Sequence, residues 1–169
     1  MSLPFMNADD DAYVNIGIMI IIIGTLSQTT RNTLKLNNER LHAFYFLVKN
    51  PVVLNLFLNK TGRGNIRLSV IDSFSISSIS PNLEPLFDRA LLKSLLAVLI
   101  SKRLIDVVYK DNKGFFYILT PKGTNVFDEL NEEHFIEIKL FCEKLTRVMS
   151  ISDTEFNSAL QSILKRDYL

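Results

Sequence analysis

The spacing of hydrophobic residues predicts a mainly helical protein with one short β-structured segment. The longest helical pattern lies in residues 82–102, where apolar residues recur three and four positions apart in two neighbouring rows. The first row is Leu83, Leu86, Phe87, Ala90, Leu91, Leu95, Val98 and Leu99, and the second is Leu92, Leu96 and Ile100. A helix that is apolar on two faces is expected to be largely enclosed, in its own fold or at an interface.

The most hydrophobic run of the chain, residues 16–24, lies inside an expected first helix at residues 9–30. Its four consecutive isoleucines favour a strand by propensity. The acidic residues 9–11 precede the run and suit a helix N-terminus better than a Mg²⁺ site, so we interpret the run as a helix. Gly17 and Gly24 share one face of it, where small residues let another helix approach closely. The run is shorter than the roughly 20 residues that span a bilayer.

Two short helices are expected next, at residues 38–49 and 51–58, and they meet at Asn50-Pro51 like a helix-turn-helix pair. Asn37 and Asn38 are the candidate N-caps of the first. Short strands are expected on either side of the pair, at residues 34–36 and 66–71.

A β-hairpin is predicted at residues 105–119, with strands at 105–109 and 115–119 joined by Lys110-Asp-Asn-Lys-Gly. Thr120 and Pro121 then cap and open another helix. The last two helices are expected at residues 132–149 and 153–166, the second capped by Asp153.

The order of these elements indicates a fold that is mainly α with a small β component. The helix, hairpin and Leu-Thr-Pro-Lys-Gly run of residues 84–123 resembles the C-terminal half of winged-helix domains, with the hairpin as the wing. We therefore expect a winged-helix module embedded in a helical domain, and the two halves of the chain are candidates for tandem winged-helix-like units. The expected divisions are a helical, helix-turn-helix-like half at 1–80, a winged-helix half at 81–130 and a helical extension at 131–169.

Composition adds one constraint on surfaces and one on partners. The mean hydropathy of +0.17 is high for a soluble monomer, which favours apolar surface covered by another subunit over a generous core. The net charge is only +1, from 19 basic and 18 acidic residues. A protein that grips DNA unaided usually has a clear basic excess, so the charge gives DNA binding no support.

Residues with catalytic or metal-binding chemistry are not gathered in the sequence. The single cysteine, Cys142, excludes an intramolecular disulfide and a cysteine-based zinc site, and it lies on an apolar stripe. His42 and His134 lack metal-ligand spacing. We therefore expect a cytoplasmic protein that is not an enzyme and has no metal or cofactor.

Two sets of residues are candidates for contacts with partners. The basic side chains that could touch DNA phosphates without reading sequence are Lys60, Arg63, Arg67, Arg89, Lys93, Lys102, Arg103, Lys110, Lys113 and Lys122. The candidate protein interface is the second apolar row, Leu92, Leu96 and Ile100.

Several segments together resemble one protein family. They are Leu3-Pro-Phe, Asn7, Asp11-Ala-Tyr-Val-Asn-Ile, Arg40-Leu-His-Ala-Phe-Tyr-Phe-Leu-Val-Lys-Asn-Pro, Ser77-Ser-Ile-Ser-Pro-Asn-Leu-Glu-Pro-Leu-Phe-Asp-Arg and Gly114-Phe-Phe-Tyr-Ile-Leu. In this order and spacing they resemble the middle components of bacterial ABC-three-component systems, over nearly the whole chain. The motifs are mostly structural and carry no catalytic residue.

The resemblance implies a small accessory subunit that acts beside an SMC/Rad50-like ATPase and an effector of the nuclease type. Lamassu-type defence systems against phage and plasmids have this organisation. Such a subunit would bridge ATPase heads or hold the effector, much as winged-helix KITE subunits do in other SMC complexes. The sequence leaves open a free-standing, dimeric winged-helix transcription regulator that binds DNA, and, as a weaker alternative, a small enzyme with an unrecognised site.

Overall fold

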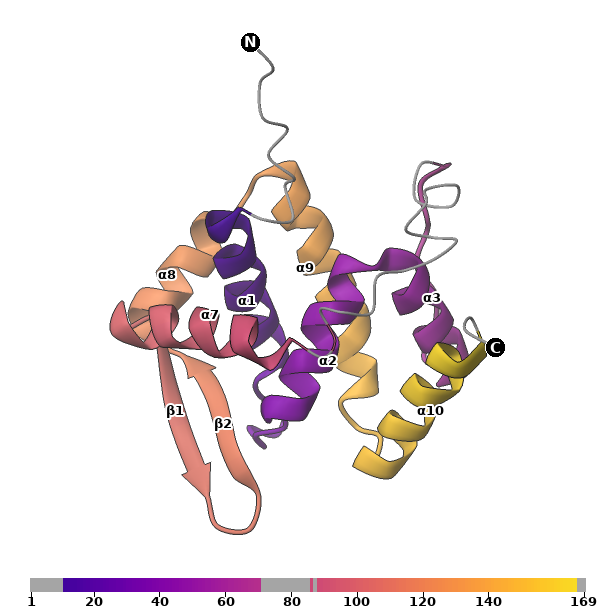
Figure 1. Ribbon diagram of the computed structural model, residues 1–169. Coiled ribbons are helices and arrows are strands. Elements are labelled where there is room, and N and C mark those ends of the chain that lie inside the picture. Colours follow the sequence, from indigo (N-terminus) through magenta and orange to yellow (C-terminus); the bar gives the residue numbers. More distant parts are fainter. Residues whose placement is uncertain (1–10, 71–85, 87, 167–169) are drawn as a thin grey trace.

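The computed structural model describes residues 11–70, 86 and 88–166, and five of its elements pack around one buried central helix (Figure 1). In chain order they are α1 (Ala12–Leu26), α2 (Asn38–Lys49), α3 (Pro51–Lys60), α7 (Arg89–Ser101), β1 (Ile105–Lys110), β2 (Gly114–Leu119), α8 (Pro121–Glu129), α9 (Glu133–Leu145), the 3-10 helix η2 (Thr146–Val148) and α10 (Asp153–Arg166). The predicted fold class, mainly helical with a helix followed by a β-hairpin, is confirmed. Among the described residues, no helix is both long and apolar enough to cross a membrane.

The central helix is α1, and the isoleucine run forms its middle. Every residue from Ile18 to Ile23 is at most 1% exposed. The Asp11 carboxylate caps the helix by accepting a hydrogen bond from the Tyr13 N–H at 2.8 Å, while the other two acidic residues of this run lie outside the described part. α1 packs against α2, α7, α8, α9 and β2. Burial on all sides therefore overrides the strand propensity of isoleucine, and much of the high hydropathy is hidden inside the chain.

The two glycines of α1 lie against side chains of neighbouring helices. A Cβ atom on Gly17 would lie 2.5 Å from the ring of Phe135 in α9. A Cβ atom on Gly24 would lie 2.7 Å from the ring of Phe127 in α8. The prediction that this glycine face permits close helix approach is confirmed.

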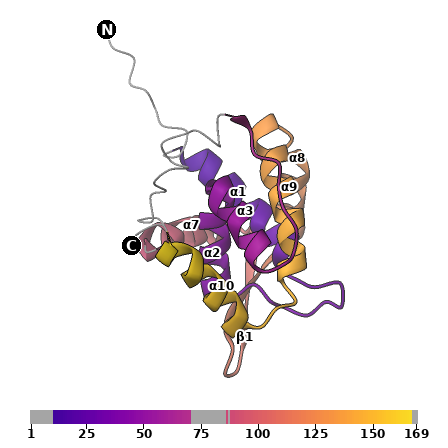
Figure 2. The same ribbon diagram turned by 90° about the vertical axis from the view of Figure 1, so that its right-hand side faces the viewer.

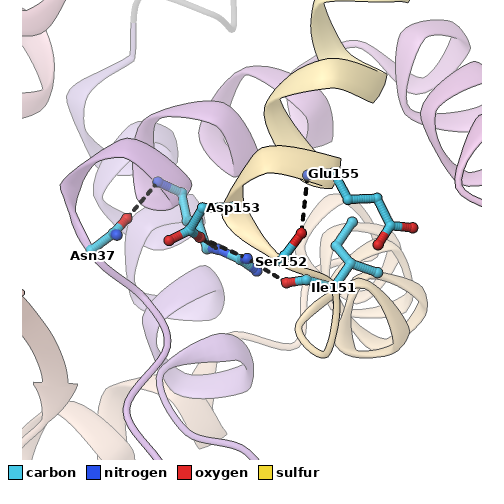
Figure 3. Close-up of polar contacts among 6 residues, drawn as sticks. Asn37, Ile151, Ser152, Asp153 and Glu155 are labelled. Atoms are coloured by element: carbon cyan, nitrogen blue, oxygen red, sulfur yellow. Dashed lines mark hydrogen bonds and ion pairs between the residues drawn. The ribbon is translucent and has the colours of Figure 1, made fainter.

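Helix α10 is attached to α2 and α3 by a buried arginine and by Phe156, whose ring packs edge-on against Phe44 of α2 and Phe57 of α3. Arg40 of α2 is buried, and its Nη2 atom lies 2.8 Å from Asp153 Oδ1 and donates to the Ile151 carbonyl at 2.7 Å (Figure 3). The predicted capping role of Asp153 is wrong, because Ser152 Oγ accepts from the N–H of the third residue after it, Glu155. The Asp153 carboxylate instead pairs with a residue 113 positions away. In Figure 2, α10 lies beside α3 and α2.

The β-hairpin forms where it was predicted, and its strands pair from Ile105 opposite Leu119 to Lys110 opposite Gly114. A hydrogen-bonded bridge between Asn37 and Phe116 ties β2 to the start of α2. The base of the hairpin thus adjoins the helical body, and its tip projects beyond the helices in both views (Figure 1, Figure 2).

Three sequence-based expectations differ from the structure. Residues 66–69 have no regular structure and Val70 is helical, so the predicted strand at 66–71 is absent over its described part; residue 71 lies outside it. The predicted strand at 34–36 is reduced to an isolated bridge between Gln28 and Leu34. The helix expected at 82–102 begins only at Arg89, because Asp88 is its non-helical N-cap, and it ends at Ser101; residues 82–85 and 87 lie outside the described part. No second hairpin accompanies α2 and α3 within residues 11–70.

The hydrophobic core is continuous across the expected divisions of the chain. Its buried residues come from α1 to α3, from α7 and the hairpin, and from α9 and α10. The three expected segments therefore share one core in this structure.

Candidate interaction surface on α7 and the hairpin

Helix α7 is buried on one face only. Asp88 caps it by accepting a hydrogen bond from the Leu91 N–H at 3.0 Å. Its buried residues are Leu92, Leu95, Leu96 and Leu99, whereas the opposite face exposes Ala90, Lys93, Ser94 and Ala97. The expectation of an enclosed helix is therefore wrong for the described part. Of the three proposed interface residues, Leu92 and Leu96 belong to the core, and only Ile100, 45% exposed, is accessible.

The hairpin carries the largest exposed apolar side chains next to α7. Val107, Tyr109 and Phe115 are between 41% and 61% exposed. They lie on one face of the hairpin, because side chains two positions apart in a strand, and those directly opposite across it, share a face. The rings of Tyr109 and Phe115 form a directly opposite pair with centroids 5.2 Å apart. We call Ile100, Val107, Tyr109 and Phe115 the hairpin surface.

The same hairpin face is core at its base and exposed at its tip. Ile105 is buried, and Tyr117 is buried with its hydroxyl donating to the Asn38 side chain of α2. Burial raises the pKa of the Tyr117 phenol above its ordinary value, more than its hydrogen bond to Asn38 lowers it. The base thus fixes the orientation of the hairpin, while the tip projects away from the helices (Figure 1).

A shallow open groove lies between the end of α7 and the base of the hairpin. It is lined by Ile100, Arg103, Ile105, Asp106, Val107, Thr120, Pro121 and Lys122. Ile100, Val107 and Pro121 are the exposed apolar residues of this lining, and its charged residues are Arg103, Lys122 and Asp106. An apolar floor with a charged rim is the usual composition of a protein-binding surface.

Local backbone chemistry positions these cations. Lys122 Nζ donates to the carbonyl of Lys102 at 3.1 Å, which satisfies an unpaired carbonyl at the end of α7. Arg103 follows α7 with φ +56°, and the Thr120 hydroxyl donates to its carbonyl at 2.7 Å. Thr120 also caps α8 through the Gly123 N–H, as predicted.

The ten basic residues proposed for phosphate contacts do not form one surface. Lys102, Arg103 and Lys122 border the groove, and Lys110 and Lys113 lie at the hairpin tip. Two others, Arg89 and Lys93, are on the exposed face of α7. The remaining three, Lys60, Arg63 and Arg67, lie at the end of α3 and in the segment after it, across the molecule from the hairpin (Figure 1).

The aromatic tip of the hairpin was not predicted as a contact surface. A usable signal was present, because Val107, Val108, Phe115 and Phe116 place apolar side chains on both faces of a two-stranded sheet. In the structure Ile105 and Tyr117 are buried on one face and Phe116 on the other, which leaves Val107, Tyr109 and Phe115 exposed.

Groups with chemical reactivity are not assembled near this surface or elsewhere in residues 11–70, 86 and 88–166. No three His, Cys, Asp or Glu side chains there lie close enough to hold a metal ion. Cys142 is fully buried, and desolvation raises the pKa of its thiol far above the ordinary value, so the reactive thiolate is disfavoured.

Comparison with known families gives one match. The family model described as ABC-three component (ABC-3C) system Middle Component 4 matches residues 26–158, from the end of α1 into α10. Neither the curated proteins nor the solved structures contain a match to the chain.

Proposed function

The chain belongs to the family of ABC-3C system Middle Component 4, an accessory component of a multi-component system, and we propose that it holds the other components together without catalysing a reaction. In this proposal it is a cytoplasmic subunit that bridges an SMC/Rad50-like ATPase and a nuclease-type effector in a Lamassu-type defence complex. The resemblance found in the sequence and the family match support this assignment.

The hairpin surface is the observation that carries the proposal. Aromatic side chains are the commonest anchors of protein interfaces, because they bury a large area with little loss of side-chain freedom. Tyr109 and Phe115 stand as a pre-arranged pair at a projecting tip, where a partner can enclose both rings. A winged-helix module formed by α7 and the hairpin thus contacts one of the two partners.

Cations beside the aromatic pair suit a partner surface with acidic side chains. Lys102, Arg103, Lys113 and Lys122 lie around the hairpin surface. Lys110 lies on the opposite face of the hairpin, with its Nζ 5.9 Å from the centre of the Phe116 ring. The same segment has two acidic residues, Asp106 and Asp111. Charge at the rim of an interface acts mainly on association rate and specificity. The same cations can contact DNA phosphates non-specifically once the partner brings DNA close.

The test is co-purification with the other components of the system. The tagged chain is co-expressed with the ATPase-like and effector components, and each is quantified after affinity purification and size-exclusion chromatography. We expect a ternary complex, and the Tyr109→Ala, Phe115→Ala double variant is expected to lose one component. The control is Leu56→Ala, which truncates a side chain of α3 that is 42% exposed and lies away from the hairpin.

Two results would contradict the proposal. One is a chain that binds neither component. The other is a chain that by itself binds a palindromic DNA site with nanomolar affinity and a steep salt dependence, which identifies the dimeric transcription regulator instead. A double variant that behaves like Leu56→Ala shows that the hairpin surface is not the contact.

A further inference from the structure

Helix α9 has an exposed apolar ridge on the side opposite its buried face. The buried stripe is Phe135, Ile138, Phe141, Cys142 and Leu145. At 100° per residue, Ile136 and Leu140 point away from this stripe, and they are 47% and 54% exposed. Their spacing of four residues places them side by side on the helix surface.

An aromatic residue of α1 extends this ridge. Tyr13 is exposed, its ring meets Phe135 edge-on at 5.8 Å between centroids, and its hydroxyl donates to Glu132 Oε1 at 3.2 Å. Glu132 lies one turn before Ile136, so the tyrosine is held at the start of the exposed face. This hydrogen bond and the nearby carboxylate charge raise the pKa of the Tyr13 phenol. We call Tyr13, Ile136 and Leu140 the α9 ridge.

The charge around the α9 ridge is acidic. Residues 128–137 contain five carboxylates and no lysine or arginine: Asp128, Glu129, Glu132, Glu133 and Glu137. Residues 138–145 add one carboxylate and two lysines, so residues 128–145 hold six carboxylates against two lysines. Lys144 lies one turn after Leu140, and Lys139 is engaged elsewhere. Its Nζ donates to the Phe127 carbonyl at 2.9 Å and lies 4.5 Å from the centre of the Phe127 ring.

The α9 ridge and the hairpin surface differ in both place and charge. The α8–α9 connection lies at the top of Figure 1, and the hairpin tip lies at the bottom. Residues 102–122 contain five basic and two acidic side chains, the reverse of the balance in residues 128–137. A partner suited to one surface is therefore repelled electrostatically by the other.

We propose that the α9 ridge is a second docking surface, and that its occupant is a basic amphipathic helix of another protein component. A helix presents apolar side chains every three to four residues, which matches the spacing of Ile136 and Leu140. Lysine or arginine side chains flanking that helix pair with the carboxylates around the ridge. The same carboxylates repel nucleic acid. The inference rests on the proposed function only in requiring a second component, and it does not involve the hairpin surface.

The experiment compares two chemically identical substitutions on different helices. Leu140→Glu lies on the ridge, and Leu56→Glu is its matched control on α3, where the leucine is also exposed. Both full-length variants are expected to keep the wild-type Tm, because neither side chain belongs to the core. Each is immobilised, and binding of the purified ATPase-like and effector components is measured separately. We expect Leu140→Glu to weaken one component at least tenfold and Leu56→Glu to change neither by more than twofold.

A second pair of variants tests the charge of the occupant. Glu133→Gln with Glu137→Gln is expected to weaken the same component and to flatten the dependence of its Kd on salt concentration. The Tyr109→Ala, Phe115→Ala variant is expected to leave this component bound. If that variant loses both components, the two surfaces form one interface and the proposal is wrong.

Other outcomes also decide the question. Equal affinities for Leu140→Glu and Leu56→Glu, with both components still bound, overturn the α9 ridge and leave the proposed function intact. A wild-type chain that binds neither component overturns both. A wild-type dimer that Leu140→Glu converts to a monomer shows that a second copy of the chain occupies the ridge, which also overturns the proposal.

Discussion

Replacing Arg103 with glycine is expected to stabilise the fold although it removes a charged side chain. Arg103 is in the left-handed region, with φ +56°, just after α7. Its N–H donates to the Ile100 carbonyl and the Leu104 N–H donates to the Leu99 carbonyl, both at 2.9 Å. These two bonds form a Schellman helix end, in which glycine is the usual residue because a Cβ atom is strained there.

The size of the effect follows from two opposing terms. A left-handed residue that carries a side chain costs about 1–2 kcal/mol. Glycine offsets part of the gain, because it adds about 0.4–1 kcal/mol of conformational entropy to the unfolded chain. The net stabilisation from Arg103→Gly is therefore about 0.5–1 kcal/mol, or an increase in Tm of roughly 1–4 °C for a chain of this length.

Lys102→Gly is the matched control, since it removes the same charge from the neighbouring position. Lys102 has φ −84°, which any residue adopts, so glycine relieves no strain there. It is expected to lower the free energy of unfolding by about 0.4–1 kcal/mol. Urea denaturation of both variants measures the difference in sign. If Arg103→Gly destabilises the chain as much as Lys102→Gly does, the reasoning from backbone strain is refuted.

The remaining predictions concern packing, reactivity and pH. Gly123→Ala is expected to lower the free energy of unfolding by about 3 kcal/mol, because the new Cβ atom would lie 2.0 Å from the backbone oxygen of Leu104. The control is Asn125→Ala at an exposed position of the same helix, whose free energy of unfolding should stay within about 0.5 kcal/mol of the wild type in the same urea titration. Cys142 should react with a thiol reagent only after unfolding, since it is buried and its thiol pKa is raised; rapid labelling of the native chain would contradict the core packing. Because the pKa of Tyr117 is raised in the folded chain, the phenol of the unfolded chain ionises first, near pH 10. The stability that the neutral phenol contributes is therefore constant below that pH and lost above it. Urea midpoints measured from pH 8 to 11 should fall at the alkaline end, and they should fall less steeply in Tyr117→Phe.

Elements with strong local signals could be predicted closely from the sequence. The Asn37 side chain caps α2 by accepting from the Arg40 N–H, and α2 begins and ends where its apolar spacing indicated. The hairpin formed where the turn residues of 110–114 separate two apolar strands. In each case the deciding interactions lie within a few residues of one another, so they can be read from neighbouring positions.

The failures depend on partners that are distant in sequence. Residues 66–70 alternate like a strand, but no described strand pairs with them, and the Ile66 N–H donates to the Asn55 side chain instead. Asp153 resembles an N-cap in the sequence, but its carboxylate accepts a hydrogen bond from the Arg40 side chain instead. The two apolar rows of the α7 segment did not reveal which one faces the core, so Leu92 and Leu96 were assigned to an interface although they are buried. Periodicity shows which residues share one face of a helix, but it does not show what that face packs against.

The two proposed surfaces are carried by elements that pack on the same buried helix, α1, and this fixes the distance between partners bound to both surfaces. Gly17 of α1 meets Phe135, which belongs to the helix that carries the α9 ridge. About two turns further along the same face of α1, Gly24 meets Leu119 at the base of the hairpin. Between these points α1 is enclosed on all sides, and close-packed interiors transmit displacement with little compression. The separation of the α9 ridge from the hairpin is therefore set by core packing, so partners bound to both would be held at a fixed distance, as by a rigid spacer.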